Sequence, residues 1–377
     1  MKSRPDGRTA QFVVRRKGIG AEDRMSAVRL WFAGIRSCRL SQKLRSAIVG
    51  DGDSFGFRIS FVSRNAGFFC YRIDFYTIQE FIIMKRTIFT GAATALITPL
   101  TATGVDYEAF GRLIDWQIDE GIDALVVCGT TGESSTLTDE EHRKCIAYCV
   151  ERTNKRVPVI AGTGSNELAY ALELTKFAGD VGADAALVVT PYYNKATQKG
   201  LVYMYQTIAE ASDIPLILYN VPSRTGVNIE PATYEALADH ENIAAFKEAN
   251  GNISKIVATM QRVRNKLDMY SGNDDQIVPL MSLGGSGVIS VLSNLLPRQT
   301  SEMCRKFMAG DVKGAAEMQF KYHDLIDLLF CEVNPIPVKA AMASMGFCED
   351  FLRLPLTKME DSNKGKMLVE MQRHGLI

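Results

Sequence analysis

The sequence lacks several features that would assign it to a protein class at once. Its eight cysteines include no Cys-x-x-Cys pair and no Cys/His cluster with the spacing of a zinc site. No apolar run reaches the roughly 20 residues of a membrane-spanning helix. Lys+Arg and Asp+Glu are balanced at 43 each, so no basic excess favours nucleic acid as a partner. These absences predict a globular protein of a reducing compartment, the cytoplasm, with no metal and no membrane partner.

The charge balance is an average over two unlike parts of the chain. Residues 1–83 hold 15 Lys/Arg against 7 Asp/Glu, whereas the remaining 294 residues hold 28 against 36. The first part shows no sustained apolar period and no apolar core of signal-peptide length. We expect residues 1–83 to be an unassigned basic extension. It is either an upstream reading-frame artefact with Met84 as the true start, a poorly ordered extension or a targeting segment.

From Met84 onward, short apolar runs alternate with longer amphipathic segments. Several of these segments open with a capping residue and an early acid, which predicts a helix start, as at Thr138 before 139–141. Nearly all-apolar strands that are each followed by a helix favour a parallel sheet covered by helices. Eight such units predict an α/β fold, a closed (β/α)8 TIM barrel over residues 84–296, in preference to an open doubly wound sheet. Residues 297–377 are expected to form a C-terminal helical appendage. The expected strands are 92–98, 124–128, 157–161, 185–190, 216–220, 244–248, 269–272 and 287–291.

Lys247 ends one of these apolar strands, where a charged amine is unusual. An unpaired ammonium costs several kcal/mol to bury, and desolvation leaves an amine partly neutral near pH 7. A neutral amine can attack a ketone to form a Schiff base. Two structural explanations stay open beside this one: a surface lysine whose stem packs while its head reaches water, and a buried ion pair with Glu248.

Polar clusters follow four of the predicted strands, at the barrel end where reactive groups gather in this architecture. After the second strand, Gly129 and Gly132 let a backbone approach closely, so that Thr130 and Thr131 can hold a small carboxylate. A tight turn with solvated hydroxyls is the alternative. The Lys-Ser/Thr ending of a phosphate loop is missing.

Two tyrosines and an arginine lie in the other clusters. Tyr219 and Tyr193 can pass protons to an imine nitrogen within hydrogen-bond reach, with Thr130 bridging them, or they simply pack at the rim. Arg224 offers a rigid fork for a carboxylate or braces its own loop. Segment 334–339 is expected to cap or kink a helix, with no chemistry. The residues alone therefore predict a Schiff-base lyase that acts on small carboxylated carbonyl compounds.

Taken together, these motifs resemble the dihydrodipicolinate synthase family of class I, pyruvate-dependent lyases. The resemblance runs from about residue 89 to 377 and covers nothing before Met84. Sister lyases such as N-acetylneuraminate lyase share single motifs, but the Val-Pro-Ser-Arg-Thr-Gly string and the paired tyrosines are more specific. The motifs that carry it are Gly-Thr-Thr-Gly-Glu-Ser from Gly129, Thr-Pro-Tyr-Tyr-Asn from Thr190, Tyr-Asn-Val-Pro-Ser-Arg-Thr-Gly from Tyr219 and Phe-Lys-Glu-Ala from Phe246.

The resemblance implies a cofactor-free enzyme that condenses pyruvate with L-aspartate 4-semialdehyde in lysine and diaminopimelate biosynthesis. Lys247 would form the Schiff base, with Tyr219, Thr130 and Tyr193 as the proton relay. Because the residue matching Tyr193 reaches into a neighbouring subunit in this family, a homotetramer built as a dimer of dimers is expected. The residues that match its substrate-binding positions are Thr131 and Gly129 for pyruvate, Arg224 for the semialdehyde carboxylate and Ile289, whose backbone carbonyl would lie near Lys247.

Feedback inhibition by lysine is expected to be weak or absent. Tyr170 stands where lysine-sensitive members carry a glutamate, and Asp139 replaces a histidine. A lost carboxylate removes a charge-assisted contact of roughly 1.5–3 kcal/mol. The remaining positions that match the lysine-binding contacts at the dimer interface are Ser134, His142, Asn166 and Tyr192.

Two other functions stay open at this stage. One is another class I lyase, which would cleave N-acetylneuraminate or a 2-keto-3-deoxy sugar acid. The other is a non-catalytic barrel that binds a ligand.

Overall fold

The computed structural model describes residues 10–14, 55–65, 68–77 and 87–377, and the chain divides into two compact units, Met1–Met84 and Lys85–Ile377. In the first unit, three strands form an antiparallel sheet in the order β1-β2-β3. They are β1 (Ala10–Val14), β2 (Phe55–Asn65) and β3 (Phe68–Thr77). No element was expected in this part of the chain.

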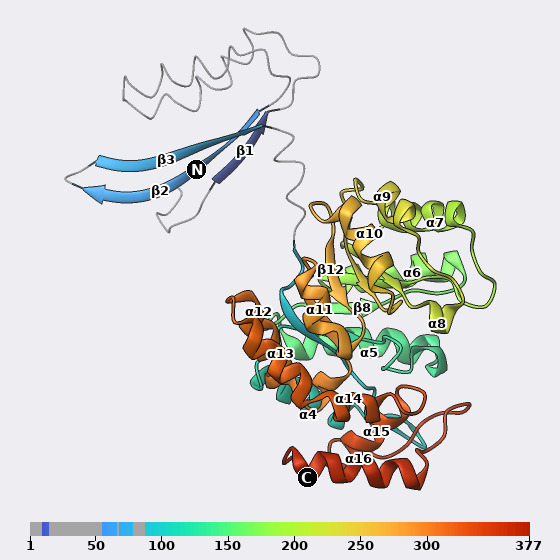
Figure 1. Ribbon diagram of the computed structural model, residues 1–377. Helices are drawn as coiled ribbons and strands as arrows, with labels where there is room; N and C mark the ends of the chain where they lie inside the picture. The colour runs from blue at the N-terminus through green and yellow to red at the C-terminus, as the bar shows by residue number, and fades with distance from the viewer. Residues whose placement is uncertain (1–9, 15–54, 66–67, 78–86) are drawn as a thin grey trace. The chain divides into compact units, whose positions relative to one another are not determined.

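In the second unit, eight parallel strands close into a barrel, so the open doubly wound alternative is wrong (Figure 1). All eight are the expected strands, with ends shifted by a few residues. In barrel order they are β4 (Gly91–Ala95), β7 (Ala124–Val127), β8 (Val159–Gly162), β9 (Ala185–Val189), β10 (Leu216–Asn220), β11 (Ile243–Glu248), β12 (Asp268–Ser271) and β13 (Gly287–Ser290), after which β13 pairs with β4. A small hairpin, β5 (Leu100–Thr101) and β6 (Gly104–Val105), follows β4.

Helices follow the strands, as the alternating pattern predicted. The capping signal before α5 is confirmed, because Thr138 Oγ1 accepts from the Glu141 amide at 3.2 Å and Glu141 accepts in return from the Thr138 amide at 3.0 Å. The helices of the barrel region are α4 (Tyr107–Asp119), α5 (Asp139–Thr153), α6 (Leu168–Asp180), α7 (Gln198–Glu210), α8 (Pro222–Thr225), α9 (Pro231–Leu237), α10 (Ile253–Val263), α11 (Ile277–Ser282) and α12 (Pro297–Met308), with short 3-10 turns η1 (Ser134–Thr136), η2 (Asp274–Gln276) and η3 (Leu292–Asn294).

Side chains on alternate strand positions fill the barrel interior. Ile217 and Tyr219 of β10 share one buried cluster with Ala245 of β11 and Ile289 of β13. Because side chains alternate along a strand, Lys247 lies on the same inner face as Ala245, and Glu248 lies on the outer face.

The C-terminal helices are α13 (Val312–Lys321), α14 (His323–Leu329), α15 (Ile336–Ser344) and α16 (Asp361–Arg373), and Figure 1 shows the last three grouped together. Val338 and Met342 of α15 belong to the same buried cluster as Leu125 of β7. The expected appendage is therefore helical, and it shares an apolar core with the barrel. No helix among the described residues is long and apolar enough to cross a bilayer.

Candidate active site

Lys247 and Tyr219 meet inside the barrel. They are register partners on the neighbouring strands β11 and β10, and only 6% and 7% of their surfaces are exposed. The Lys247 Nζ lies 4.5 Å from the centroid of the Tyr219 ring, over its face. Within the part of the chain that the structure describes, this amine makes no hydrogen bond and no ion pair. The explanation as a surface lysine is therefore wrong.

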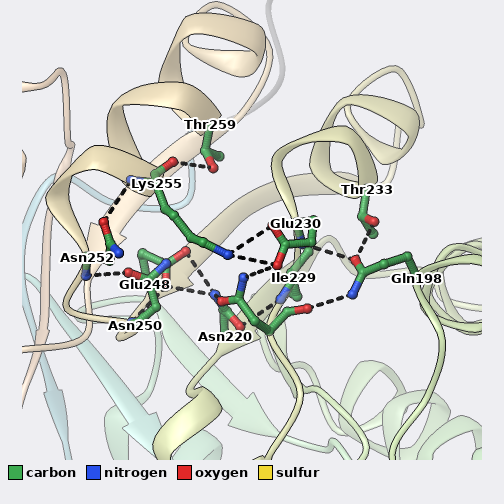
Figure 2. Close-up of polar contacts among 11 residues, drawn as sticks. Gln198, Asn220, Ile229, Glu230, Thr233, Glu248, Asn250, Asn252, Lys255 and Thr259 are labelled. Atoms are coloured by element: carbon green, nitrogen blue, oxygen red, sulfur yellow. Dashed lines mark hydrogen bonds and ion pairs between the residues drawn. The ribbon is translucent and has the colours of Figure 1, made fainter.

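Glu248, the next residue, belongs to a separate buried network on the outer face of the same strands (Figure 2). Its Oε1 accepts from Asn220 Nδ2 and from the Asn250 amide, both at 2.9 Å, and its Oε2 accepts from the Tyr234 hydroxyl at 3.1 Å. Burial raises the pKa of Glu248 to about 7, although these donors oppose the shift. The explanation of Lys247 as an ion pair with Glu248 is therefore wrong as well.

Asn220 extends this network to the loop that carries Arg224. Its Nδ2 also donates to Asn228 Oδ1 at 2.9 Å, and its Oδ1 accepts from the Ile229 amide at 3.0 Å. The Asn220 side chain, where the loop begins, thus holds the two residues where the loop ends. The Arg224 guanidinium donates to the backbone oxygen of Asn334 at 3.0 Å, so it contacts the C-terminal region and does not brace its own loop.

The turn after β7 places Thr130 and Thr131 at the carboxyl end of the barrel. The Gly132 and Glu133 amides donate to the carbonyls of Gly129 and Thr130, each at 3.1 Å, which closes the expected tight turn. Thr131 is only 2% exposed, and its Oγ1 accepts from Asn334 Nδ2 at 3.0 Å, so the alternative of solvated hydroxyls is wrong for this residue.

Close packing around this turn requires one of the expected glycines and one glycine of the neighbouring strand β8 that was not expected. A Cβ on Gly132 would lie 3.2 Å from the Cys128 backbone, whereas a Cβ on Gly129 would find its nearest neighbour at 3.7 Å. At Gly162, the last residue of β8, a Cβ would lie 2.2 Å from the Cys128 carbonyl oxygen. Close packing under the turn therefore depends on Gly162 and Gly132 more than on Gly129.

Tyr193 does not share the buried surroundings of Tyr219. It is 91% exposed, and its φ of 70° lies in the left-handed region that aromatic residues rarely adopt. The expected relay of Thr130, Tyr193 and Tyr219 is therefore not assembled around Lys247 within this single chain. Ile289, by contrast, is fully buried on the inner face of β13.

Asp274 is a buried acid near the site that the sequence analysis missed. It lies in η2, just after β12, and its Oδ2 accepts from the Val291 and Leu292 amides at 2.9 Å each. Burial raises its pKa, and hydrogen bonds from Ser290 and from the Leu292 and Val291 amides act in the opposite direction, with a smaller contribution from the nearby Lys247. The Asn-Asp-Asp sequence at the end of a strand was the only signal that pointed to it.

The positions matched to lysine binding lie near the ends of β8 and β9 and on η1 and α5. His142 is buried, its Nε2 lies 2.8 Å from the Gly162 carbonyl oxygen, and burial lowers its pKa. Asn166 Nδ2 donates to the Tyr192 backbone oxygen at 3.4 Å, while Ser134 is half-buried in η1. The Asp139 carboxylate pairs with Arg143 at 2.8 Å, and Arg143 and the nearby Tyr170 both lower its pKa. The two residues that depart from the lysine-sensitive pattern thus lie close together in this chain.

Known proteins of one family resemble this chain over nearly all of the second unit. The Dihydrodipicolinate synthetase family matches residues 88–373. The 4-hydroxy-tetrahydrodipicolinate synthase of Lachnoclostridium phytofermentans is 55% identical over 292 residues, which covers 77% of this chain and 99% of the relative. The crystal structure of dihydrodipicolinate synthase from Aquifex aeolicus aligns with a TM-score of 0.75 at 48% identity, over 76% of this chain and 99% of that chain. A structure described as the first monomeric dihydrodipicolinate synthase variant aligns with a TM-score of 0.75 at 41% identity, over 77% and 98%.

Proposed function

The chain belongs to the dihydrodipicolinate synthetase family, and we infer from this membership and from its site that it catalyses the 4-hydroxy-tetrahydrodipicolinate synthase reaction. It is a pyruvate-dependent lyase of lysine and diaminopimelate biosynthesis on a TIM barrel. The observation that carries the mechanism is the Lys247 amine, buried inside the barrel over the Tyr219 ring and without an ionic partner among the described residues.

Lys247 is the residue that we propose condenses with pyruvate. The neutral amine adds to the ketone carbon, the carbonyl oxygen takes up protons and leaves as water, and a C=N bond remains. Tyr219 lies against the amine and is the proposed proton carrier for the water-forming step, with Thr130 next in the relay. Loss of a proton from the methyl group then gives the enamine that attacks the aldehyde carbon of the second substrate.

The substrate carboxylates need positive or donor groups at the rim. Thr131 and Gly129, in the turn after β7, are proposed to hold the pyruvate carboxylate through the hydroxyl and the backbone amides. Arg224 is proposed to bind the carboxylate of L-aspartate 4-semialdehyde. It would use the guanidinium N–H groups that do not donate to Asn334. The carbonyl of Ile289 is the proposed backbone acceptor near Lys247.

Tyr193 supports the proposal of an oligomer. An aromatic side chain that is 91% exposed, on a backbone held at φ 70°, is unusual unless another surface covers it. We propose that it completes the relay of a second subunit, in a homotetramer built as a dimer of dimers. Because one solved relative is described as a monomeric variant, family membership alone does not decide this state.

The division of the chain into functional regions is also a proposal. Residues 84–296 would form the catalytic barrel and 297–377 its helical support, while no role is proposed for 1–83, since the family match starts at residue 88. We propose the cytoplasm as the location, where the free thiols of Cys128, Cys145 and Cys149 would stay reduced.

Weak or absent inhibition by lysine is the regulatory proposal. Asp139 is already paired with Arg143, so it offers a lysine ammonium less than a free glutamate would. Full loss of activity at low millimolar lysine would contradict this proposal.

One experiment tests the proposed reaction in two steps. The protein is incubated with pyruvate and borohydride and mapped by peptide mass, and a reduced adduct is expected on Lys247. The untreated protein is then assayed with pyruvate and L-aspartate 4-semialdehyde, where condensation is expected and Arg224→Ala should cripple it. No adduct would favour a ligand-binding barrel, and an adduct without condensation would favour a sugar-acid lyase.

A further inference from the structure

Asn334 lies between the two groups proposed to bind substrate carboxylates. It stands two residues before α15 and is only 6% exposed. Its Nδ2 donates to Thr131 Oγ1 at 3.0 Å, and its backbone oxygen accepts from the Arg224 guanidinium at 3.0 Å. The segment 334–339 does open a helix, as the sequence predicted, but its first residue also reaches two loops of the active site.

We propose that Asn334 is a positioning residue for pyruvate, which acts by directing the hydroxyl proton of Thr131 toward the substrate carboxylate. This inference rests on the proposed function, because it takes Thr131 to be a pyruvate-binding group. It assigns the C-terminal helical region a part in substrate binding that its sequence did not indicate.

The direction of this hydrogen bond leaves the hydroxyl proton of Thr131 free to donate. A threonine hydroxyl has one proton to donate and two lone pairs that accept. Because Asn334 Nδ2 occupies a lone pair of Thr131 Oγ1, the hydroxyl proton remains available for an acceptor. Within the described residues this hydroxyl has no other hydrogen-bond partner. A carboxylate is the strongest acceptor for this free hydroxyl proton, because a hydrogen bond to an ionised acceptor is stronger than one to a neutral acceptor.

A second contact from the same segment holds the turn in place. Lys339, on α15, is fully buried, and its Nζ pairs with Glu133 at 2.6 Å and donates to the Thr98 carbonyl at 2.6 Å. Glu133 in turn donates its amide proton to the Thr130 carbonyl. The carboxylate-binding turn is therefore held from the C-terminal region at two points, so the position of Asn334 relative to Thr131 is restrained.

The test compares two substitutions that a purely structural role would rank in the opposite order. Asn334→Asp keeps the shape of the side chain, but its carboxylate accepts the Thr131 proton and repels the pyruvate carboxylate. Asn334→Ala loses the bond and leaves the hydroxyl free to rotate. We expect the KM for pyruvate to rise about tenfold in Asn334→Ala and about a hundredfold in Asn334→Asp, with kcat changed less than threefold in the alanine variant.

Asn363→Ala is the matched control. Asn363 lies in the same C-terminal region and donates to Glu332 Oε1 at 2.8 Å, so the variant loses one hydrogen bond to the segment beside Asn334 and none to Thr131. Its KM for pyruvate should equal that of the wild type. If Asn334→Asp binds pyruvate as well as the wild type or better than Asn334→Ala, the proposal is overturned.

A double-mutant cycle keeps the test usable if Asn334→Asp does not fold. On a Thr131→Val background the hydroxyl is absent, so adding Asn334→Ala should raise the KM for pyruvate no further. Fully additive effects would overturn the positioning role. If the wild-type protein forms no pyruvate adduct at all, the proposed function itself is wrong. Failure of the positioning role and failure of the proposed function can therefore be told apart.

Discussion

The two faces of the β10–β11 pair differ in whether a buried ionisable group has hydrogen-bond partners. On the inner face, the Lys247 amine lies over the Tyr219 ring, with no hydrogen bond or ion pair among the described residues. On the outer face, one residue along each strand, the Glu248 carboxylate accepts from Asn220, Asn250 and Tyr234. The β11 strand therefore presents the proposed reactive amine to the barrel interior, while the hydrogen bonds of the next residue fix the strand on its outer face. A functional site thus departs from the rule of satisfied buried polar groups, and its immediate neighbour obeys it.

This contrast predicts that substitutions on the inner face remove activity and those on the outer face remove stability. Lys247→Met should show the largest effect, since methionine fills the volume of the lysine stem but has no amine. We expect activity to fall at least about 1,000-fold and the borohydride adduct to vanish, because Lys247 is the group proposed to form the Schiff base. The free energy of unfolding, measured in urea, should not fall, because a buried unpaired amine is lost. An adduct on the variant would contradict the assignment.

Tyr219→Phe sharpens the same contrast within the inner face. The ring that covers the Lys247 amine at 4.5 Å remains, and only the hydroxyl is lost. If that hydroxyl carries a proton, kcat should fall about 100-fold while thermal stability changes little. A steady-state assay of the condensation gives kcat, and a melting curve gives the thermal stability. If the variant keeps the kcat of the wild type, Tyr219 carries no proton and only packs at the rim.

On the outer face, Glu248→Ala should act mainly on stability. It leaves donors on Asn220, Asn250 and Tyr234 buried without their acceptor, so we expect the free energy of unfolding to fall by about 4 kcal/mol. Lys255→Ala is the control from the same view, because its ion pair with Glu230 is 46% and 43% exposed and should contribute less than about 1 kcal/mol (Figure 2). Equal losses in the two variants would break the comparison.

The smallest expected effect is a pH dependence of stability that stems from Glu248. Burial raises its pKa to about 7, above its ordinary value of 4.5, so between these values the folded protein binds more protons than the unfolded chain. Stability should therefore fall as pH rises through this interval, by about 3 kcal/mol in total, and level off above it. Glu248→Gln should flatten this part of the curve, because its amide does not titrate. Urea unfolding of both proteins at pH 5 and pH 8 measures the difference, and parallel curves would refute the assignment.

Local patterns predicted most of the barrel. The alternation of apolar runs with amphipathic segments predicted all eight strands, and the capping signal at Thr138 predicted the start of α5. The polar residues at the strand ends placed Lys247 and Tyr219 together, because the carboxyl ends of neighbouring parallel strands meet at one rim. Segment 334–339 was predicted only as the opening of a helix. Its contact with Thr131 spans 203 residues of sequence, a separation over which no local pattern carries information.

The sequence by itself determined the strand period, the end of the barrel where the polar clusters gather and the amine that we propose as the reactive group. Only the tertiary structure decided that Lys247 and not Glu248 faces the barrel interior, that Asn334 donates to the Thr131 hydroxyl and that Tyr193 lies exposed. The physical reason is that alternation along a strand creates two faces without choosing between them. Closure of the barrel makes that choice, because it buries one face inside and packs the other against helices whose positions depend on contacts between distant segments.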